Sequence, residues 1–433
     1  MLSAAPVAPI AAHPLLLFLL QVGLLLGAAI LLGRLAMRFG MPAIVGELGA
    51  GVLLGPSLFG WLAPAISGWI FPAVPEQVHL LDAVGQVGVL LLVGLTGIEL
   101  DLPMVRRQGA TALRISIAGL VIPFALGIAL GFPLASLLRT GNSDASVFAL
   151  FLGVAMCVSA IPVIAKTLMD MNLIHRDVGQ LTLAAGMVDD AFGWFMLSVV
   201  SAMAVGGLTA GKVTLALAYL VLVVLAAALV GRPLVRMVLR RSSASPPQTT
   251  AAVAAMILLA GAGTQSLGLE AVFGAFLCGI LIGSSTEFVR ARTASLRTVV
   301  LSVLAPIFFA TAGLRVDLRA LANPMILAAA VAVLLVAIVG KFTGAYLGAR
   351  LSRLSRWEAL ALGAGMNARG VIEVIVAMVG LRLGILNSAS YTIIVLVAVA
   401  TSVMAPPLLG LSLKRLESTP EEESRLNARL ATS

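Results

Sequence analysis

The chain has 433 residues; 60% are hydrophobic, only 11% are charged, and the formal net charge is +9. A soluble domain carries about 25% charged residues, so this composition excludes the soluble enzyme classes and indicates a membrane protein. A basic chain raises the question of nucleic-acid binding, which depends on where the bases lie. The two cysteines, Cys157 and Cys278, lie in apolar runs, so we expect buried free thiols rather than disulfides or metal ligands.

Apolar stretches long enough to cross a membrane recur along the whole chain. A helical span needs about 20 apolar residues. The N-terminus has no Lys or Arg and the first apolar run is long, so no cleavable signal is predicted. We predict one membrane domain (1–413) and a short, charged, mobile tail (414–433). The thirteen predicted spans are 14–33, 42–58, 80–99, 111–137, 146–170, 178–204, 213–236, 249–265, 269–286, 296–314, 323–349, 357–381 and 388–412.

The basic residues are spread unevenly over the connections between these spans. With the N-terminus outside, the cytoplasmic loops and the tail hold 21 of the 28 bases, and the external loops hold 5. This asymmetry is a positive-inside signal, which favours an odd number of spans and a cytoplasmic C-terminus. The basic charge is therefore interpreted as topology and contact with anionic lipid, not as nucleic-acid binding.

Five ionisable residues remain inside predicted spans: Asp189, Asp190, Lys341, Arg369 and Glu373. Each costs about 2.5–3.5 kcal/mol to insert, so such groups have partners or line a water-filled cavity. Asp190 lies about 18 Å into its span and Lys341 about 13 Å from the inner end of its own, so the two can meet near mid-membrane. The structural alternative is a set of ion pairs that hold helices together.

Two predicted spans contain helix-breaking residues at similar depth. Ser159-Ala-Ile-Pro162 interrupts the fifth span, and Gly365-Met-Asn-Ala-Arg-Gly370 interrupts the twelfth. These spans are seven apart, so spans 1–6 and 8–13 can form an inverted repeat, and paired broken helices indicate a transporter binding site. A simple proline kink is the alternative for the fifth span alone. GxxxG spacings that permit close helix contact occur at Gly23/Gly27, Gly51/Gly55 and Gly340/Gly344.

Several segments, in order along the chain, resemble bacterial sodium/proton antiporters of the monovalent cation:proton antiporter superfamily, most closely its second large family. The Asp-Asp segment and the Asn-Ala-Arg-Gly segment are the most specific of them. Potassium-efflux relatives in that family often carry a soluble nucleotide-binding tail, which this sequence lacks. The segments are 42–56 (PAIVGELGAGVLLGP), 94–102 (GLTGIELDL), 159–166 (SAIPVIAK), 188–194 (VDDAFGW), 305–315 (APIFFATAGLR) and 367–373 (NARGVIE).

The resemblance implies an all-α polytopic fold of thirteen helices with two crossed discontinuous helices. It implies a core (about 111–204 and 323–412), dimerisation helices (about 14–99 and 249–314) and a linker helix (about 213–236). It further implies a homodimer in the bacterial inner membrane, an elevator motion, a role in pH homeostasis and no cofactor. The transported ions are Na⁺ and H⁺, with K⁺ or Li⁺ as alternatives.

The resemblance also assigns roles to residues. Asp190 matches the position that binds the cation or proton, Asp189 the partner of Lys341, and Ser159 the polar position at the helix break. A proton and a cation would compete for the oxygens of Asp190, supplemented by Ser159 and the free carbonyls near Ala160. If Lys341 also delivers a proton, two protons exchange for one Na⁺ and transport is electrogenic.

Other polar residues in the spans have structural or gating roles in this interpretation. Arg369 and Glu373, four residues apart, are expected to pair on one helix face, with gating as the alternative. Pro162 and Asn367 shape the two breaks. Glu47 is placed near the cytoplasmic funnel, where a snorkelling or capping role is equally possible.

Three other functions are weighed against an antiporter. An intramembrane aspartyl protease needs two converging carboxylates, which adjacent residues on one helix cannot provide. An ion channel is distinguished by ohmic single-channel currents rather than saturable exchange. A Na⁺-coupled symporter on the same fold requires an organic substrate that stimulates Na⁺ uptake.

Overall fold

A computed structural model describes residues 10–72, 74–100, 102–141, 143–171, 173–206, 210–242, 245–284, 292–416 and 419–423. Within them the secondary structure is helical, apart from an isolated bridge between Arg139 and Leu386. The first helices are α1 (Ala12–Arg38), α2 (Ala43–Leu54), α3 (Phe59–Leu62), α4 (Pro64–Ile70), α5 (Pro75–Glu99), α6 (Leu102–Leu138), α7 (Ala145–Cys157), α8 (Ile161–Asp170), α9 (Asp177–Gly206) and α10 (Ala210–Ala226).

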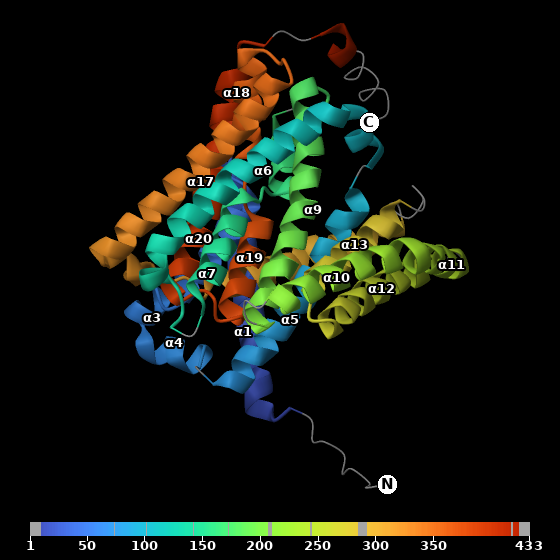
Figure 1. Ribbon diagram of the computed structural model, residues 1–433. Coiled ribbons are helices and arrows are strands. Elements are labelled where there is room, and N and C mark those ends of the chain that lie inside the picture. The colour runs from blue at the N-terminus through green and yellow to red at the C-terminus, as the bar shows by residue number, and fades with distance from the viewer. Residues whose placement is uncertain are drawn as a thin grey trace.

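The chain continues through a π-helical turn, η1 (Ala227–Gly231), into the second half (Figure 1). The later elements are α11 (Arg232–Ser242), α12 (Pro246–Ser266), α13 (Ala271–Gly283), α15 (Ala294–Val299), η2 (Val300–Leu304), α16 (Ala305–Gly313), η3 (Leu318–Ala322), α17 (Pro324–Leu351), α18 (Arg356–Met366), α19 (Val371–Arg382) and α20 (Ser388–Leu413).

Each predicted span overlaps one or more of these helices. Among the described residues, ten helices or continuous helix runs are long and apolar enough to cross a membrane, and α18 with α19, bent by 43°, makes an eleventh. The remaining two predicted spans correspond to α7 with α8 and to α13, whose apolar helices are shorter. The all-helical membrane fold is confirmed, and the count of thirteen stays a prediction.

The helices pack in two groups. In one, α2 and α16 contact α1, α5 packs on α13 and α16, and α12 packs on α13. In the other, α6 contacts α7, α9 and α17, while α18 contacts α9, α17 and α20. Figure 1 shows α6, α17 and α20 running together on one side and α10 to α12 on the other. Both cysteines are buried and unpaired, as expected.

Two of the three GxxxG spacings mark close helix contacts. A Cβ at Gly51 would lie 1.9 Å from the carbonyl oxygen of Ala310, and one at Gly344 would lie 2.4 Å from that of Ala118. A Cβ at Gly23 or Gly27 meets no atom within 4 Å. The first two sites therefore allow backbones to touch, α2 against α16 and α17 against α6, whereas the α1 spacing does not contact another part of the described chain.

We expect Gly51→Leu to lower the apparent melting temperature of the purified protein, because the new side chain must displace the backbone of α16. Overpacking of this kind costs about 1–3 kcal/mol. Gly23→Leu is the matched control and should leave the melting temperature unchanged. Equal melting temperatures for the two variants would contradict the α2–α16 contact.

The start of the tail is docked rather than mobile, which corrects the sequence-based expectation for residues 419–423. Oε2 of Glu422 lies 2.9 Å from Nε of Arg176, and Oε1 accepts a 2.7 Å hydrogen bond from the backbone N–H of Asp177. The backbone N–H of Thr419 donates to the same carboxylate at 3.0 Å. Glu422 is therefore buried against the loop before α9. Residues 417–418 and 424–433 lie outside the described chain.

This docking should persist at neutral pH and weaken only in acid. Burial raises the pKa of Glu422, but the N–H groups of Asp177 and Thr419 and the Arg176 guanidinium outweigh it and hold the pKa below 4.5. A carboxyl with a lowered pKa contributes stability that is present above its undocked pKa and lost as the pH falls through the lowered value. Amide exchange of residues 414–416 and 419–423, corrected for intrinsic rates, should show protection from pH 7 to 5 and release only as the pH falls below the ordinary glutamate pKa, which is about 4.3. Release between pH 7 and 5 would contradict a lowered pKa for Glu422. The control variant Glu422→Gln should lack the acid-dependent release.

Candidate ion-binding site

The two predicted helix breaks meet inside the membrane domain. α7 ends at Cys157 and α8 begins at Ile161, while α18 ends at Met366 and α19 begins at Val371. The backbone N–H of Ala160 donates a 3.1 Å hydrogen bond to the carbonyl of Ala368, which joins the two breaks directly. Four half-helix ends therefore converge, and their unpaired backbone groups create partial positive and negative charges at one place.

Proline and glycine have different roles in the two breaks. Pro162 lies in the first turn of α8, where its missing N–H removes no helical hydrogen bond. The predicted break in the fifth span is therefore present, and Pro162 marks the start of α8; the alternative of a proline kink in one continuous helix is wrong. Gly370 has φ 155°, and a Cβ there would lie 2.7 Å from Cγ2 of Val163. Glycine is required at this point because any side chain would strain the backbone and collide with α8.

Asp189 is held by three buried side chains. Its Oδ2 lies 2.5 Å from Nζ of Lys341 and accepts a 3.0 Å hydrogen bond from Ser159. Its Oδ1 accepts a 2.5 Å hydrogen bond from Ser116 of α6. Nζ of Lys341 also donates to the carbonyl of Cys157, at the end of α7, at 2.5 Å. A buried carboxylate with this many donors and one neutralising cation is a fixed structural charge.

Asp190 has a different environment from its neighbour. It is completely buried, and neither of its carboxylate oxygens has a hydrogen-bond partner among the described residues. The backbone N–H of Ile161, the first residue of α8, faces the same carboxylate. Buried carboxylates are normally paired, so both oxygens of Asp190 are available for a proton or a cation.

Ser159 does not contact Asp190, contrary to the expected ligand set. Its hydroxyl lies between Oδ2 of Asp189 and the carbonyl of Met366, at 3.0 and 2.9 Å. It therefore connects the fixed carboxylate to the C-terminal end of α18. The physical reason is geometric: adjacent residues on a helix point about 100° apart, and the break presents Ser159 to the Asp189 face of α9.

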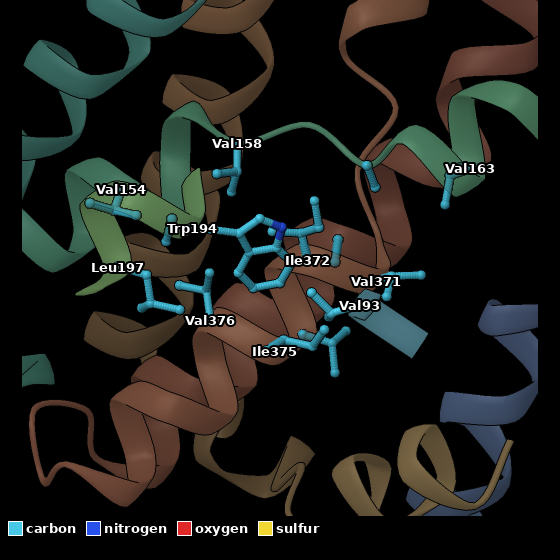
Figure 2. Close-up of a cluster of buried hydrophobic side chains, with 14 of the residues drawn as sticks. Val93, Val154, Val158, Val163, Trp194, Leu197, Val371, Ile372, Ile375 and Val376 are labelled. Atoms are coloured by element: carbon cyan, nitrogen blue, oxygen red, sulfur yellow. The ribbon is translucent and has the colours of Figure 1, made fainter. Parts of the chain in front are cut away.

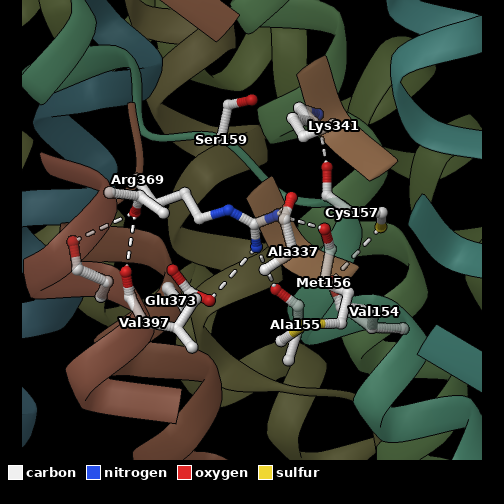
Figure 3. Close-up of polar contacts among 12 residues, drawn as sticks. Val154, Ala155, Met156, Cys157, Ser159, Ala337, Lys341, Arg369, Glu373 and Val397 are labelled. Atoms are coloured by element: carbon white, nitrogen blue, oxygen red, sulfur yellow. Dashed lines mark hydrogen bonds and ion pairs between the residues drawn. The ribbon is translucent and has the colours of Figure 1, made fainter. Parts of the chain in front are cut away.

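Arg369 joins the two breaks through backbone carbonyls (Figure 3). Its guanidinium donates to the carbonyls of Ala155 at 2.8 Å and Met156 at 2.5 Å, in the last turn of α7, and to Ala337 of α17 at 3.0 Å. It also pairs with Glu373 at 3.2 Å, the contact that the four-residue spacing predicts. Arg369 thus satisfies C-terminal carbonyls of a half-helix that ends inside the membrane domain.

The second break has further internal support. Nδ2 of Asn367 donates to the carbonyl of Ile338 in α17 at 3.1 Å, and Ser402 of α20 donates to the carbonyl of Arg369. Oε2 of Glu373 has no hydrogen-bond partner among the described residues. These contacts hold the non-helical backbone inside the protein, and burial in protein is one condition under which such backbone is tolerated at membrane depth.

A buried apolar cluster surrounds Trp194 of α9 (Figure 2). Trp194, one turn after Asp190 on α9, is 1% exposed, and its indole lies among Val158, Ile372 and Val376. Water is excluded from this cluster, so charges nearby interact more strongly than in solvent.

A cavity of about 350 Å³ lies where α1 ends and α2 begins, between these helices and α8 and α20. Thr167 and Pro406 line it on the α8 and α20 side, and Met37 and Met41 line it on the other. Glu47 is not among its lining residues; it lies within α2, with its Cγ packed beside Gly33 of α1. Its expected place near the cytoplasmic funnel stays a prediction.

Two features of the site were not predicted from the sequence. Ser116 carries no motif or spacing that distinguishes it from other serines, and only the packing of α6 on α9 brings it to Asp189. The carbonyl acceptors of Arg369 are likewise invisible to side-chain patterns. Two signals pointed to this cluster: the depth argument, which brought Lys341 to the level of the Asp pair, and the resemblance, which implied the pairing of Lys341 with Asp189 that the structure shows.

Comparison with known proteins decides the family. A family model described as sodium/hydrogen exchanger, transmembrane, matches residues 24–415. The chain belongs to this family. The antiporter resemblance read from the sequence motifs is thereby confirmed, and the exchanger is a multi-pass transporter of monovalent cations and protons.

Curated relatives of the exchanger carry antiporter names. It is 33% identical over 402 residues to the Na⁺/H⁺ antiporter NhaS4 of Synechocystis, covering 92% of this chain and 97% of the relative. It is 28% identical to the Na⁺/H⁺-K⁺ antiporter GerN of Bacillus cereus, covering 90% and 95%. Cation/H⁺ antiporter 17 of Arabidopsis thaliana is 31% identical over 96% of the exchanger. That protein is longer, and the match covers only 52% of its length.

The fold also matches solved structures. The sodium proton antiporter MjNhaP1 of Methanocaldococcus jannaschii superposes with a TM-score of 0.65 over 93% of the exchanger and 99% of that chain, at 17% identity. This likeness confirms the helical antiporter fold and carries no information about ion preference.

Proposed function

We propose that the exchanger carries out Na⁺/H⁺ antiport, with the cation and the proton competing for Asp190. The observation that carries this proposal is a fully buried carboxylate, at the crossing of two broken helices, whose two oxygens have no hydrogen-bond partner among the described residues. A group that binds either a proton or a cation, but never both, couples the proton flux to the cation flux. No second coupling site is then needed. Hard monovalent cations favour oxygen ligands, which the carboxylate of Asp190 supplies. The carbonyl of Ala160, expected to be a free ligand, instead accepts hydrogen bonds from the N–H groups of Val163 and Ile164.

Asp189 and Lys341 set the charge of the site. In this proposal Ser159 and Ser116 orient Asp189, and Lys341 weakens its 2.5 Å pair with Asp189 and releases a proton when the cation binds. Protons from both Asp190 and Lys341 then exchange for one Na⁺. The net charge moved makes transport electrogenic, and the membrane potential contributes about 2.3 kcal/mol per 100 mV per charge.

The two packing groups of helices support an elevator motion. The core would comprise α6–α9 and α17–α20. The scaffold would comprise α1–α5, α12, α13, α15 and α16, with α10 and α11 as the linker. The core would slide past the scaffold and expose Asp190 to each side in turn. We propose that the N-terminus lies outside and the C-terminus in the cytoplasm, because of the positive-inside asymmetry of the loops. The proposal includes a homodimer in a bacterial inner membrane, as the sequence resemblance implies.

K⁺/H⁺ antiport is the second candidate. Two relatives support it by name: the K⁺/H⁺ antiporter 1 of Saccharomyces cerevisiae, 29% identical, and the Na⁺/H⁺-K⁺ antiporter GerN. Purified exchanger in proteoliposomes that contain a pH-sensitive dye should move protons when Na⁺ is added. When K⁺ alone is added, it should move few protons. Proton movement driven by K⁺ and not by Na⁺ would replace the first candidate with the second.

We expect Lys341→Gln to remove the potential dependence of exchange. Without a titrating ammonium only one proton exchanges for one cation, so imposed valinomycin/K⁺ potentials should no longer change the initial rate. The variant should also be less stable, because Asp189 is left without a cation in a buried position; breaking such a pair costs about 3–5 kcal/mol. Lys341→Arg is the control that retains the charge. Unchanged potential dependence in Lys341→Gln would reject the role of Lys341.

A further inference from the structure

An open groove runs along α2, between α1 on one side and α20 on the other. It has a volume of about 430 Å³, and every residue that lines it is apolar. Phe39 and Met41 lie at one end, Leu53 and Leu318 at the other, and Val395 of α20 forms part of the far wall. We call this the α2 groove.

The shape of the groove suits a hydrocarbon chain. It follows the 12 residues of α2, a length of about 18 Å, which is more than half of the roughly 30 Å hydrocarbon layer. Phe39 is 72% exposed and Leu53 is 41% exposed, so no described part of the chain covers its ends. At mid-height a Cβ on Gly49 would meet no atom within 4 Å, so the groove is open along its floor.

Charge at one end distinguishes the groove from the rest of the apolar surface. Arg34 and Arg38 lie one turn apart in the last turns of α1, within five residues of Phe39, and both are exposed on α1 beside the residues that line the groove. Among the described residues no carboxylate lies within ion-pair distance of either guanidinium. Paired arginines of this kind bind phosphate at the membrane surface.

We propose that the α2 groove holds an acyl chain of an anionic phospholipid whose phosphate binds Arg34 and Arg38. The apolar lining sets the chain site, and the arginines select an anionic headgroup over a zwitterionic one. The consequence for transport rests on the proposed function: α2 belongs to the scaffold and α20 to the core, so the bound chain lies at the seam where the two would slide.

Photolabelling of the full-length exchanger tests this binding directly. The protein is reconstituted in phosphatidylcholine vesicles with a minor fraction of phosphatidylglycerol. Either phosphatidylglycerol or phosphatidylcholine carries a diazirine in one acyl chain. Phosphatidylglycerol should label peptides of α2 and α20 in preference to phosphatidylcholine, by roughly five-fold for each arginine. Arg34→Gln/Arg38→Gln should abolish this preference and leave labelling by phosphatidylcholine unchanged.

A second pair of variants tests the chain site. Gly49→Leu fills the floor of the groove without meeting another atom and should remove labelling of α2 by both lipids. Gly263→Leu, on the exposed face of α12, also meets no atom within 4 Å and should not change it. Equal labelling of α2 by both lipids in the unaltered protein, labelling that survives Gly49→Leu, or cross-links from the groove to a second copy of the chain would each overturn the proposal. None of these readouts requires transport, so loss of the proposed antiport would leave the result for the groove unaffected.

Discussion

Asp190→Asn is expected to abolish cation-dependent proton movement in proteoliposomes while the protein remains folded. The amide keeps the size and shape of the side chain but cannot exchange a proton for a cation. Since neither oxygen of Asp190 has a hydrogen-bond partner among the described residues, the substitution removes no contact that holds the helices. The melting temperature should therefore stay close to that of the unaltered protein, and the dye signal on addition of Na⁺ should fall to that of empty vesicles.

Asp189→Asn is the matched control, one position earlier on the same helix. It weakens contacts with Lys341, Ser116 and Ser159, and leaves a buried ammonium without its counter-charge. We expect this variant to lose stability by about 3–5 kcal/mol. Full activity of Asp190→Asn, or a larger loss of stability at position 190 than at 189, would contradict the division of roles between the two carboxylates.

Arg369→Gln is expected to have the largest effect on folding. The guanidinium satisfies the carbonyls of Ala155, Met156 and Ala337 and neutralises Glu373, all in the buried interior. Glutamine leaves Glu373 as an uncompensated buried charge, at a cost of about 3–5 kcal/mol. The measurement is the yield of monodisperse protein together with its melting temperature.

The double variant Arg369→Gln/Glu373→Gln separates the two contributions. Removing both charges should restore the part of the stability that Arg369→Gln loses through the unpaired carboxylate. The stability that is still missing measures the lost hydrogen bonds to the α7 carbonyls. A melting temperature for Arg369→Gln equal to that of the unaltered protein would show that the guanidinium does not hold the crossing together.

The helical fold and its two interruptions could be predicted from the sequence because each rests on local chemistry. Apolar length defines a span, and Pro162 and Gly370 mark the starts of α8 and α19. Lys341 and the Asp pair could be brought together from depth alone, since a charge in hydrocarbon needs a partner at its own level.

Contacts that depend on helix rotation and packing could not be predicted. Nothing in the local sequence says that Ser159 turns to Asp189 rather than Asp190, or that Ser116 of α6 completes the same site. The pairs Gly23/Gly27 and Gly51/Gly55 have the same four-residue spacing, yet within the described chain only the second pair packs against a neighbouring helix. The docked position of Glu422 likewise depends on a loop about 245 residues away in sequence.

Binding of ²²Na⁺ to the purified exchanger as a function of pH tests competition at Asp190 most directly. If one proton and one cation share this carboxylate, the apparent Na⁺ affinity should fall about tenfold for each unit of decreasing pH on the acid side of the titration. If Lys341 also releases its proton, the fall should be steeper where both groups titrate. Asp190→Asn should bind no Na⁺ at any pH. Na⁺ binding that is independent of pH, or that persists in Asp190→Asn, would contradict the account.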